Sequence, residues 1–508
     1  MPKIFRDPLH SLVRSLTKAE KRNFRLYAKR LQSKQDMLFV RLFDILDKAI
    51  TYDDQLIKEK LKLTGSNLSN LKRHLYAQIL KSLRLLHIEK DREIQIREQI
   101  DHAKILYEKG LYLQSLKLLD RVRAIAANAH QEVLVLEIIE IQKYIEERHI
   151  TRSRKEKGKM EALLNAAEQQ EQLISNMVRL SNLKIEVHGL YITMGHARNE
   201  KDHQQVTEKF LATLQEFEAK KLGFMEQVFL HQSYMWYYYI LLDFEKCHHH
   251  AHRWVAIFDR HPDMIKDDPV LYMRGLAYEL TTLFSLRHRE AYDKTMEKFE
   301  LFSKEYDSHM NMTGRIINFL YLYTARLNKH FLAGTYAEGI KLVPQIERGI
   351  KRYEPFIDIH RIMVFNYKMA WLFFGAGNYS KSIDYLNAII NLEAGHLRED
   401  IQCYSRLLHL IAHYELGNHE YLRYQVETVA RFFEKMKDLN HIQREILGFF
   451  RKNSALRGAG LQLALQHLRE KVIILSNDPY ERRAFQHLDV LEWIDKKLSI
   501  LNKTTRNK

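Results

Sequence analysis

The residues most able to hold a metal ion form one histidine-rich cluster, CHHHAH, at positions 247–252. On a helix, His248 and His252 lie one turn apart and could face the same ion, with His231 or His261 as a third ligand. The cluster lacks the glutamate of an HExxH motif. With 26 histidines in the chain, some neighbouring histidines are expected by chance. We therefore predict no metal site.

The sequence contains no motif of a common catalytic or cofactor site. It has no GxxxxGK[ST] phosphate loop, no GxGxxG fingerprint after a strand and no GxSxG elbow. Nearby carboxylate pairs such as Asp53–Asp54, Glu146–Glu147 and Asp267–Asp268 are sequence neighbours on expected loops or exposed faces. Acid–base catalysis needs a cleft that shifts the pKa of one carboxyl group, and adjacency does not indicate a cleft. We predict a protein that is not an enzyme and has no cofactor.

An aromatic run, WYYYILLDF (236–244), could in principle stack on bases. It is apolar on nearly every face of a helix, which is typical of a buried segment. We interpret this run as core.

The composition favours long helices. The 508 residues include seven prolines, and residues 9–261 contain none. Because proline breaks helices, this gap indicates long helices joined by short loops. Two cysteines cannot form a disulfide framework, and the strongest apolar run has eight residues, whereas a bilayer span needs about 20. The N-terminal stretch has no signal-peptide features. We expect a cytoplasmic protein without a membrane segment.

A repeated turn is the strongest signal of organisation. GLYLQSLKLL (110–119), GTYAEGIKLV (334–343) and GNYSKSIDYL (377–386) share a glycine, an aromatic residue two places later and a small residue three places after that. Weaker copies are DFEKCH, AYDKTM and GNHEYL. The assigned slots are Gly110, Tyr112 and Ser115; Phe244 and Cys247; Tyr292 and Thr295; Gly334, Tyr336 and Gly339; and Gly377, Tyr379 and Ser382. Successive aromatic slots from residue 244 onward lie 40–48 residues apart, a period that predicts a solenoid of helix pairs.

Each residue type in this turn has a physical reason. Glycine ends the first helix because it adopts a positive φ at low cost. The aromatic residue opens the second helix and packs against the first, and the small residue one turn later lets the two backbones approach. A single pair cannot bury its apolar face, so the pairs must stack.

These turns resemble the Gly-x-Tyr-x-x-Ala turn of the tetratricopeptide repeat (TPR) superfamily, with Ser115 and Ser382 at the alanine position. The resemblance covers residues 95 to about 440. Because the interval is longer than 34 residues, the chain is more similar to degenerate TPR-like domains of bacterial regulators. Its whole length looks like bacterial proteins with a basic helical head before such repeats. The resemblance implies an all-α, right-handed α-solenoid of TPR-like hairpins that binds a protein or peptide on its inner face.

Both ends of the chain are basic. Residues 1–90 contain 20 Lys and Arg against nine Asp and Glu, and residues 451–508 contain 12 against six. We predict a helical head at 1–90, a TPR-like solenoid at 91–440 and a helical C-terminal cap at 441–508.

The head also has the outline of a helix-turn-helix, because a glycine-containing link at 64–66 joins two amphipathic segments. In that case Lys72, Arg73, Lys81 and Arg84 of the second segment would contact nucleic acid. Helix packing alone also explains its leucines, and we favour a head that caps the solenoid.

The sequence thus predicts a non-catalytic interaction scaffold that holds a peptide or protein partner on the inner face of a superhelix. The alternative is a nucleic-acid-binding regulator that docks through its basic head and senses a partner with its repeats. Salt dependence of binding separates the two, because phosphate contacts release counterions.

Overall fold

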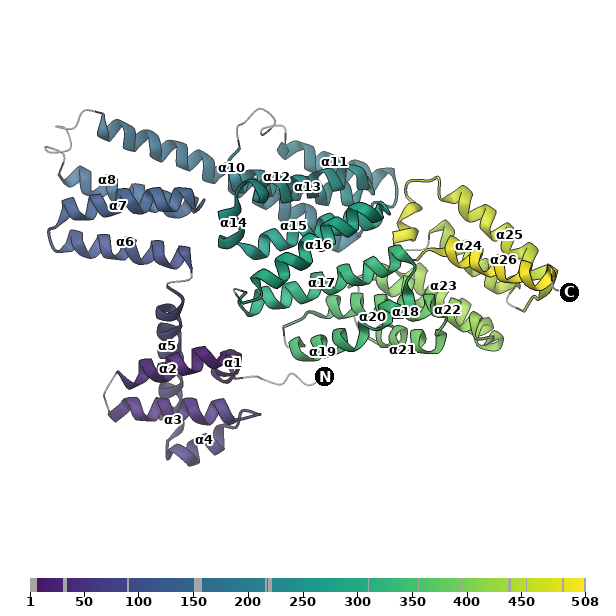
Figure 1. The fold of residues 1–508 in the computed structure, drawn as a ribbon, viewed down its shortest axis with the longest axis horizontal. Helices are drawn as coiled ribbons and strands as arrows, with labels where there is room; N and C mark the ends of the chain where they lie inside the picture. The colour runs from purple at the N-terminus through teal and green to yellow at the C-terminus, as the bar shows by residue number, and fades with distance from the viewer. Residues whose placement is uncertain are drawn as a thin grey trace. The chain divides into compact units, whose positions relative to one another are not determined.

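In the computed structural model the chain is helical, and no strand occurs among the residues that the structure describes (Figure 1). The described residues are 7–30, 34–88, 91–149, 158–214, 217, 222–308, 310–354, 356–392, 395, 397–436, 440–453, 455–486 and 488–506. The predicted all-α class is confirmed. A helix with the length and apolarity to span a bilayer is not found in these ranges. The chain divides into unit 1, Met1–Ile174, and unit 2, Ser175–Lys508.

Unit 1 starts with a head of short helices around a phenylalanine core. Its helices are α1 (Pro8–Ser15), α2 (Lys18–Lys29), α3 (Lys34–Lys48), α4 (Asp54–Leu61) and α5 (Gly65–His87). Phe24 and Phe43 are buried with their ring centroids 4.5 Å apart. Leu75 and Ile79 of α5 are buried in the same cluster. One helix face of each segment therefore forms a common core.

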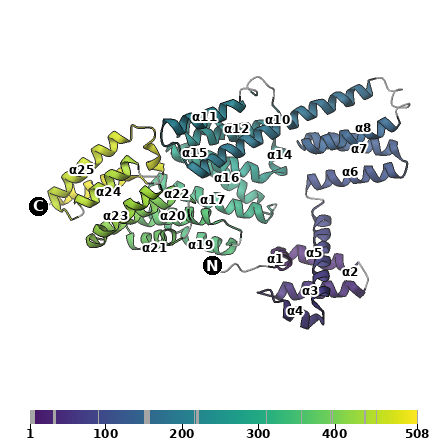
Figure 2. The same cartoon turned by 180° about the vertical axis from the view of Figure 1, so that it is seen from behind.

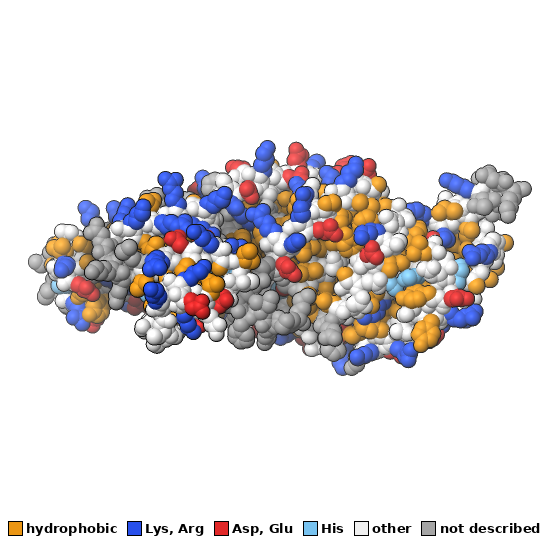
Figure 3. Space-filling model, turned by 90° about the horizontal axis from the view of Figure 1, so that it is seen from below, with side chains coloured by type: hydrophobic (Ala, Val, Ile, Leu, Met, Phe, Trp, Pro, Cys, Tyr) orange, Lys and Arg blue, Asp and Glu red, His pale blue; other side chains and the backbone are white. Residues whose placement is uncertain are grey.

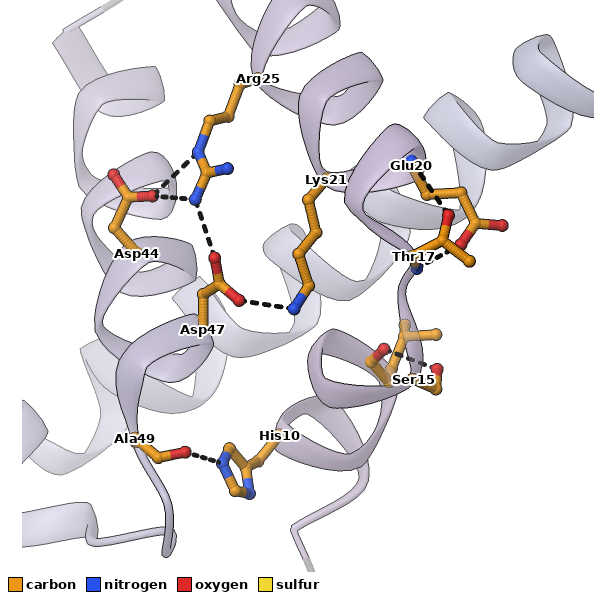
Figure 4. Close-up of polar contacts among 10 residues, drawn as sticks. His10, Ser15, Thr17, Glu20, Lys21, Arg25, Asp44, Asp47 and Ala49 are labelled. Atoms are coloured by element: carbon orange, nitrogen blue, oxygen red, sulfur yellow. Dashed lines mark hydrogen bonds and ion pairs between the residues drawn. The ribbon is translucent and has the colours of Figure 1, made fainter. Parts of the chain in front are cut away.

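Ion pairs tie α2 to α3 at the edge of this core. Arg25 donates to Asp44 and Asp47, each at 2.9 Å, and Lys21 lies 2.6 Å from Asp47 (Figure 4). Thr17 begins α2 with a reciprocal capping box to Glu20. Part of the head's basic charge is thus neutralised within the head.

The rest of unit 1 is built from three antiparallel helices. They are α6 (Arg92–Glu108), α7 (Tyr112–Asn128) and α8 (Glu132–Arg148). Ile100, Leu119 and Ile138 are buried between them. The next helix, α10 (Lys159–Met194), runs across the division between the two units.

Unit 2 is a succession of helices, most of them in pairs. They are α11 (Glu200–Leu214), α12 (Phe224–Ile240), α13 (Phe244–Arg260), α14 (Pro262–Asp267), α15 (Pro269–Ser285), α16 (Arg289–Tyr306), α17 (Met312–Ala333), α18 (Tyr336–Ile340), α19 (Val343–Tyr353), α20 (Ile359–Gly375), α21 (Tyr379–Ile390), α22 (Glu399–Glu415), α23 (His419–Lys435), α24 (His441–Asn453), α25 (Gly458–Leu475), the 3-10 turn η1 (Arg482–Gln486) and α26 (Val490–Arg506). Figure 1 and Figure 2 show the partners in pairs such as α12/α13 and α20/α21 side by side.

The repeated turn has one backbone geometry. In each of five pairs of unit 2, a residue with positive φ stands two places before the second helix. These residues are Leu242, Arg287, Gly334, Gly377 and Gly417, at intervals of 40–47 residues. Gly110 occupies the same place before α7 in unit 1. Leu242 and Arg287 adopt this backbone conformation although they are not glycines. The turn therefore forms even where the sequence has no glycine to mark it.

The small residue of the second helix contacts the backbone of the first. Ser115 Oγ donates to the carbonyl of Ala103 at 2.7 Å, and Ser382 Oγ to that of Ala370 at 2.8 Å. Cys247 Sγ lies 3.2 Å from the carbonyl of Met235, again 12 residues earlier. At Gly339, a Cβ would lie 3.1 Å from His330 Cβ on the first helix, α17, and 2.7 Å from Leu372 Cδ2 on α20. In these four repeats the site holds a small residue that lets the two helices approach closely.

One repeat has a different register from the one expected for Tyr292 and Thr295. Because α16 begins at Arg289, two places after Arg287, Tyr292 occupies the small-residue site and Thr295 lies one turn beyond it. Tyr292 is fully buried, and its hydroxyl donates to the carbonyl of Ala325 on α17 at 2.7 Å. Its polar end therefore reaches the following pair, a role that the small residues do not have.

The last residues of unit 2 contact several earlier helix pairs. We call residues 480–486 and 488–498 the C-terminal strap. Arg287 Nη2 lies 2.7 Å from Asp489, Tyr336 donates to Glu492 at 2.8 Å, and Trp493 Nε1 and Lys497 Nζ donate to the buried Glu415 at 2.8 and 2.6 Å. The strap thus contacts pairs far along the chain from it, in addition to α25.

Replacing Ser382 by leucine tests the close approach. Ser382→Leu should lower the free energy of unfolding by about 1–3 kcal/mol, because the larger side chain has no space against Ala370. The matched change Ser380→Leu, at an exposed position two residues earlier in the same helix, should change the free energy of unfolding by less than about 0.5 kcal/mol. Urea denaturation measures both, and equal effects would contradict the packing described.

Candidate functional site

Of the four basic residues predicted on α5, Lys72 is engaged within the head. Its ammonium contacts the Asp7 carboxylate and donates to the Tyr52 hydroxyl at 2.7 Å, and it lies 4.6 Å from the centroid of that ring. The Asp7 side chain is only 8% exposed. Lys72 therefore stabilises the junction of α1, α5 and the link before α4.

The other three residues are exposed on α5. Among the described residues, Arg73 donates to Asn70, one turn earlier on α5, whereas Arg84 lies 3.4 Å from Asp101. Lys81 has no ion-pair partner among the described residues. On the face drawn in Figure 3, blue Lys and Arg side chains alternate with red acidic and orange apolar ones. The structure separates Lys72 from the exposed residues with which the sequence groups it.

The distinction between Lys72 and Lys81 is testable by hydrogen exchange on the full chain. Lys72→Met should speed amide exchange in residues 7–30, because it leaves the buried Asp7 carboxylate without its cation, at a cost of about 1–3 kcal/mol. Lys81→Met should leave exchange there unchanged. The same exchange rates in both variants would refute a structural role for Lys72.

The histidines of the cluster make separate contacts, one with His231 of α12 and two with residues of α15. His231 and His250 have Nδ1 atoms 3.0 Å apart, whereas His248 and His252 on α13 contact Thr282 and Glu279 of α15 at 3.2 and 2.9 Å. Across the described residues, no group of three or more His, Cys, Asp or Glu side chains is arranged to hold a metal ion.

A large cavity in unit 2 is the strongest candidate site. It has a volume of about 520 Å³, within the range of roughly 300–1,000 Å³ of small-ligand sites. Its lining comes from α10, α12, α15, α17 and α20 and from the start of α22, so the first helices of several successive pairs face it. We call it the aromatic cavity. Ile192 and Ile359 line it and are 44% and 43% exposed, so it opens to solvent beside apolar side chains.

The register of the turns determines which residues line the aromatic cavity. The residue six places before each positive-φ turn position lines it in four successive pairs. These residues are Trp236, Thr281, Asn328 and Trp371. Nine places before the turn, Tyr278 and Lys368 do the same. A repeating position therefore contributes to one wall, and a correct turn register would have located it from the sequence.

The aromatic run at 236–244 serves both core and cavity. Trp236, Tyr237 and Ile240 are buried core residues, and Trp236 also lines the cavity together with the partly buried Tyr239. Trp236 stacks on His188 with centroids 4.3 Å apart, and Tyr278 meets its edge at 5.2 Å. Our interpretation of the run as core misses this second role, because core-facing and cavity-facing residues are equally apolar.

Cations stand among these rings. Arg361 lies 5.4 Å from the Tyr321 ring centroid. Two turns later on α20, Lys368 Nζ lies 5.4 Å from the Phe284 centroid and donates to Asn328 Oδ1 at 2.6 Å. Neither side chain has an ion-pair partner among the described carboxylates. Both can therefore offer charge to a bound molecule, with aromatic faces beside them.

A third lining cation is matched. Arg398, at positive φ before α22, donates to both carboxylate oxygens of Asp400 at 2.8 and 2.5 Å. Burial, and then the charges of Arg398 and Arg361, lower the pKa of His360 to about 4. His360 is therefore neutral at pH 7 and adds polarity, but no charge, to the lining.

More positive charge lies next to the lining. Against the effect of its burial, the charges of Tyr278 and Tyr321 act to raise the pKa of Arg274, and among the described residues its buried Nε has no hydrogen-bond partner. Burial, and then the charges of Arg274, Arg361 and Lys184, lower the pKa of His188. Cations from α10, α15 and α20 thus converge on one side of the aromatic cavity.

A second hollow, of about 540 Å³, shares Phe284 and Trp371 with the aromatic cavity. Pro479, Arg482 and Phe485 also line it, so the C-terminal segment forms one of its walls. Its lining has Asp243, Glu245 and Glu492 beside Arg287 and Arg482. Unlike the aromatic cavity, it has more acidic than basic side chains in its lining.

Comparison of the chain with family models, with curated proteins and with solved structures gives no match.

Replacing Lys368 by methionine should stabilise the chain and reduce the pH dependence of its stability. Burial, and then the charge of Arg398, lower the pKa of Lys368 from 10.5 to about 8. Between these values the unfolded chain holds a proton that the folded chain has released, so wild-type stability rises with pH, by at most about 1.4 kcal/mol per pH unit. Urea unfolding of both proteins at pH 8 and at pH 10 measures this, and an equal rise in Lys368→Met would contradict it.

Proposed function

We propose that this protein is a non-catalytic interaction scaffold whose TPR-like hairpins stack as a right-handed α-solenoid and bind a segment of a protein partner in the aromatic cavity. The observation that carries the proposal is the lining of that cavity. It is formed by the first helices of successive pairs, at matching positions before each turn. The inner face of such a stack is where helical-repeat proteins bind their partners.

The chemistry of the cavity suits a short chain segment. Its partly exposed rings, Tyr321 and Phe284 among them, offer apolar area with little side-chain freedom to lose. Asn328 and Thr324 add hydrogen-bonding groups beside them. A few polar groups set in an apolar concave surface are typical of a site that fixes the orientation of what it binds.

Site-specific photo-crosslinking in the native cell tests this proposal. A benzophenone amino acid at Tyr321, which lines the cavity, should give a discrete crosslinked protein band. The same residue at Tyr424, 78% exposed on α23 and outside the cavity lining, is the control and should not give that band. Mass spectrometry then identifies the band.

The same band at both positions, or none at Tyr321, would contradict the proposal. A salt-sensitive gel shift with DNA or RNA, lost on combining Arg73→Glu with Lys81→Glu, would favour the regulator instead.

A further inference from the structure

The aromatic cavity has more positive than negative charge. Its described lining contains Arg361, Lys368 and Arg398 against one carboxylate, Asp358. Asp400 neutralises Arg398, and Asp358 accepts the backbone N–H of Arg361 at 3.0 Å as the cap of α20. The side chains of Arg361 and Lys368 are the two charges left without a carboxylate.

Burial makes the charge of Lys368 unfavourable and lowers its pKa. Lys368 lies between the Phe284 and Phe331 rings, 5.4 and 5.5 Å from their centroids, and has only a neutral amide as acceptor. A partly desolvated ammonium in such surroundings is stabilised by an anion more strongly than one in bulk water is. A bound carboxylate would therefore offset the cost of desolvating this ammonium group.

The spacing of the two cations limits what can satisfy both. Arg361 and Lys368 are seven residues apart on α20, so they lie on one face about 10 Å apart along its axis. A peptide in the polyproline II conformation covers that distance in about three residues, and its side chains return to the same side every three residues. Two acidic side chains about three positions apart would reach the two cations, and an apolar residue near them would meet Tyr321 and Phe284.

We propose that the partner segment bound in the aromatic cavity is acidic, with two Asp or Glu residues about three positions apart that pair with Arg361 and Lys368 and an aromatic or aliphatic residue beside them. This inference rests on the proposed function and specifies its partner. A single-stranded nucleic acid fits less well. Its bases need open aromatic faces, whereas Trp236 and Tyr278 pack on other rings and Ile192 and Ile359 stand at the opening.

A random phage-displayed library of 12-residue peptides, selected on the full chain, tests the inference. Selected peptides should be enriched in pairs of Asp or Glu two to four positions apart with an apolar residue near them. The same selection on the double variant Arg361→Glu with Lys368→Glu should lose this motif. The control, Lys294→Glu with Lys351→Glu, makes the same change in net charge at exposed, unpaired positions of α16 and α19 and should retain it.

One selected peptide, made synthetically with a fluorescent label, gives the affinities. Its Kd should rise at least about tenfold for Arg361→Gln with Lys368→Met, and by a similar factor when its acidic residues become Asn or Gln, in line with two lost charge pairs. Circular dichroism of the variant checks that it is folded. Because neutral side chains replace the buried charge, this variant keeps the test valid if charge reversal disrupts folding.

The outcomes separate the two levels of the proposal. Peptides without acidic pairs that still lose binding on Tyr321→Ala would overturn the acidic segment and leave the scaffold function standing. Failure to select any peptide that depends on the cavity would overturn both. Tighter binding of a 12-nucleotide single strand, weakened by Arg361→Gln, would replace the acidic segment by a nucleic acid.

Discussion

The close approach of two helices just after each turn is the constraint on which the rest of unit 2 depends. Ser382 and Cys247 each contact a backbone carbonyl 12 residues earlier. The side chain of the second helix therefore lies within hydrogen-bonding distance of the backbone of the first. This contact restricts the rotation of the first helix about its axis, and so restricts which of its residues can reach the cavity. The same places before each turn, such as those of Trp236 and Trp371, consequently line the aromatic cavity.

Binding and stability make opposite demands on the aromatic cavity. Apolar residues in place of Arg361 and Lys368 would suit the rings around them and would not require a charge to be desolvated. The C-terminal strap offers compensation elsewhere in unit 2, because it joins distant pairs through Asp489, Glu492 and the buried Glu415. The stability that these contacts contribute can offset the cost of unpaired charge in the aromatic cavity.

The head shows how net charge and charge available for binding differ. Residues 1–90 have a surplus of basic residues, yet Lys21, Arg25 and Lys72 are each bound to carboxylates within the head. These ion pairs position helices of the head. They also neutralise part of the positive charge that a count of basic residues in the sequence assigns to a helix face. The exposed charge that remains on α5 belongs to Arg73 and Lys81.

The sequence by itself determined the helical class, the turns at Gly110, Gly334 and Gly377 and the small residues after them, because a glycine turn followed by helical periodicity is a local property. It could not locate the turn at Arg287, where no glycine marks the positive φ, and so it misplaced Tyr292 by three residues. It also could not separate cavity residues from core, or show that Lys72 is paired while Lys368 is not. Those distinctions depend on which residues from distant helices meet, and only the tertiary structure decides that, since one side chain's charge or apolar surface does not specify what lies opposite it.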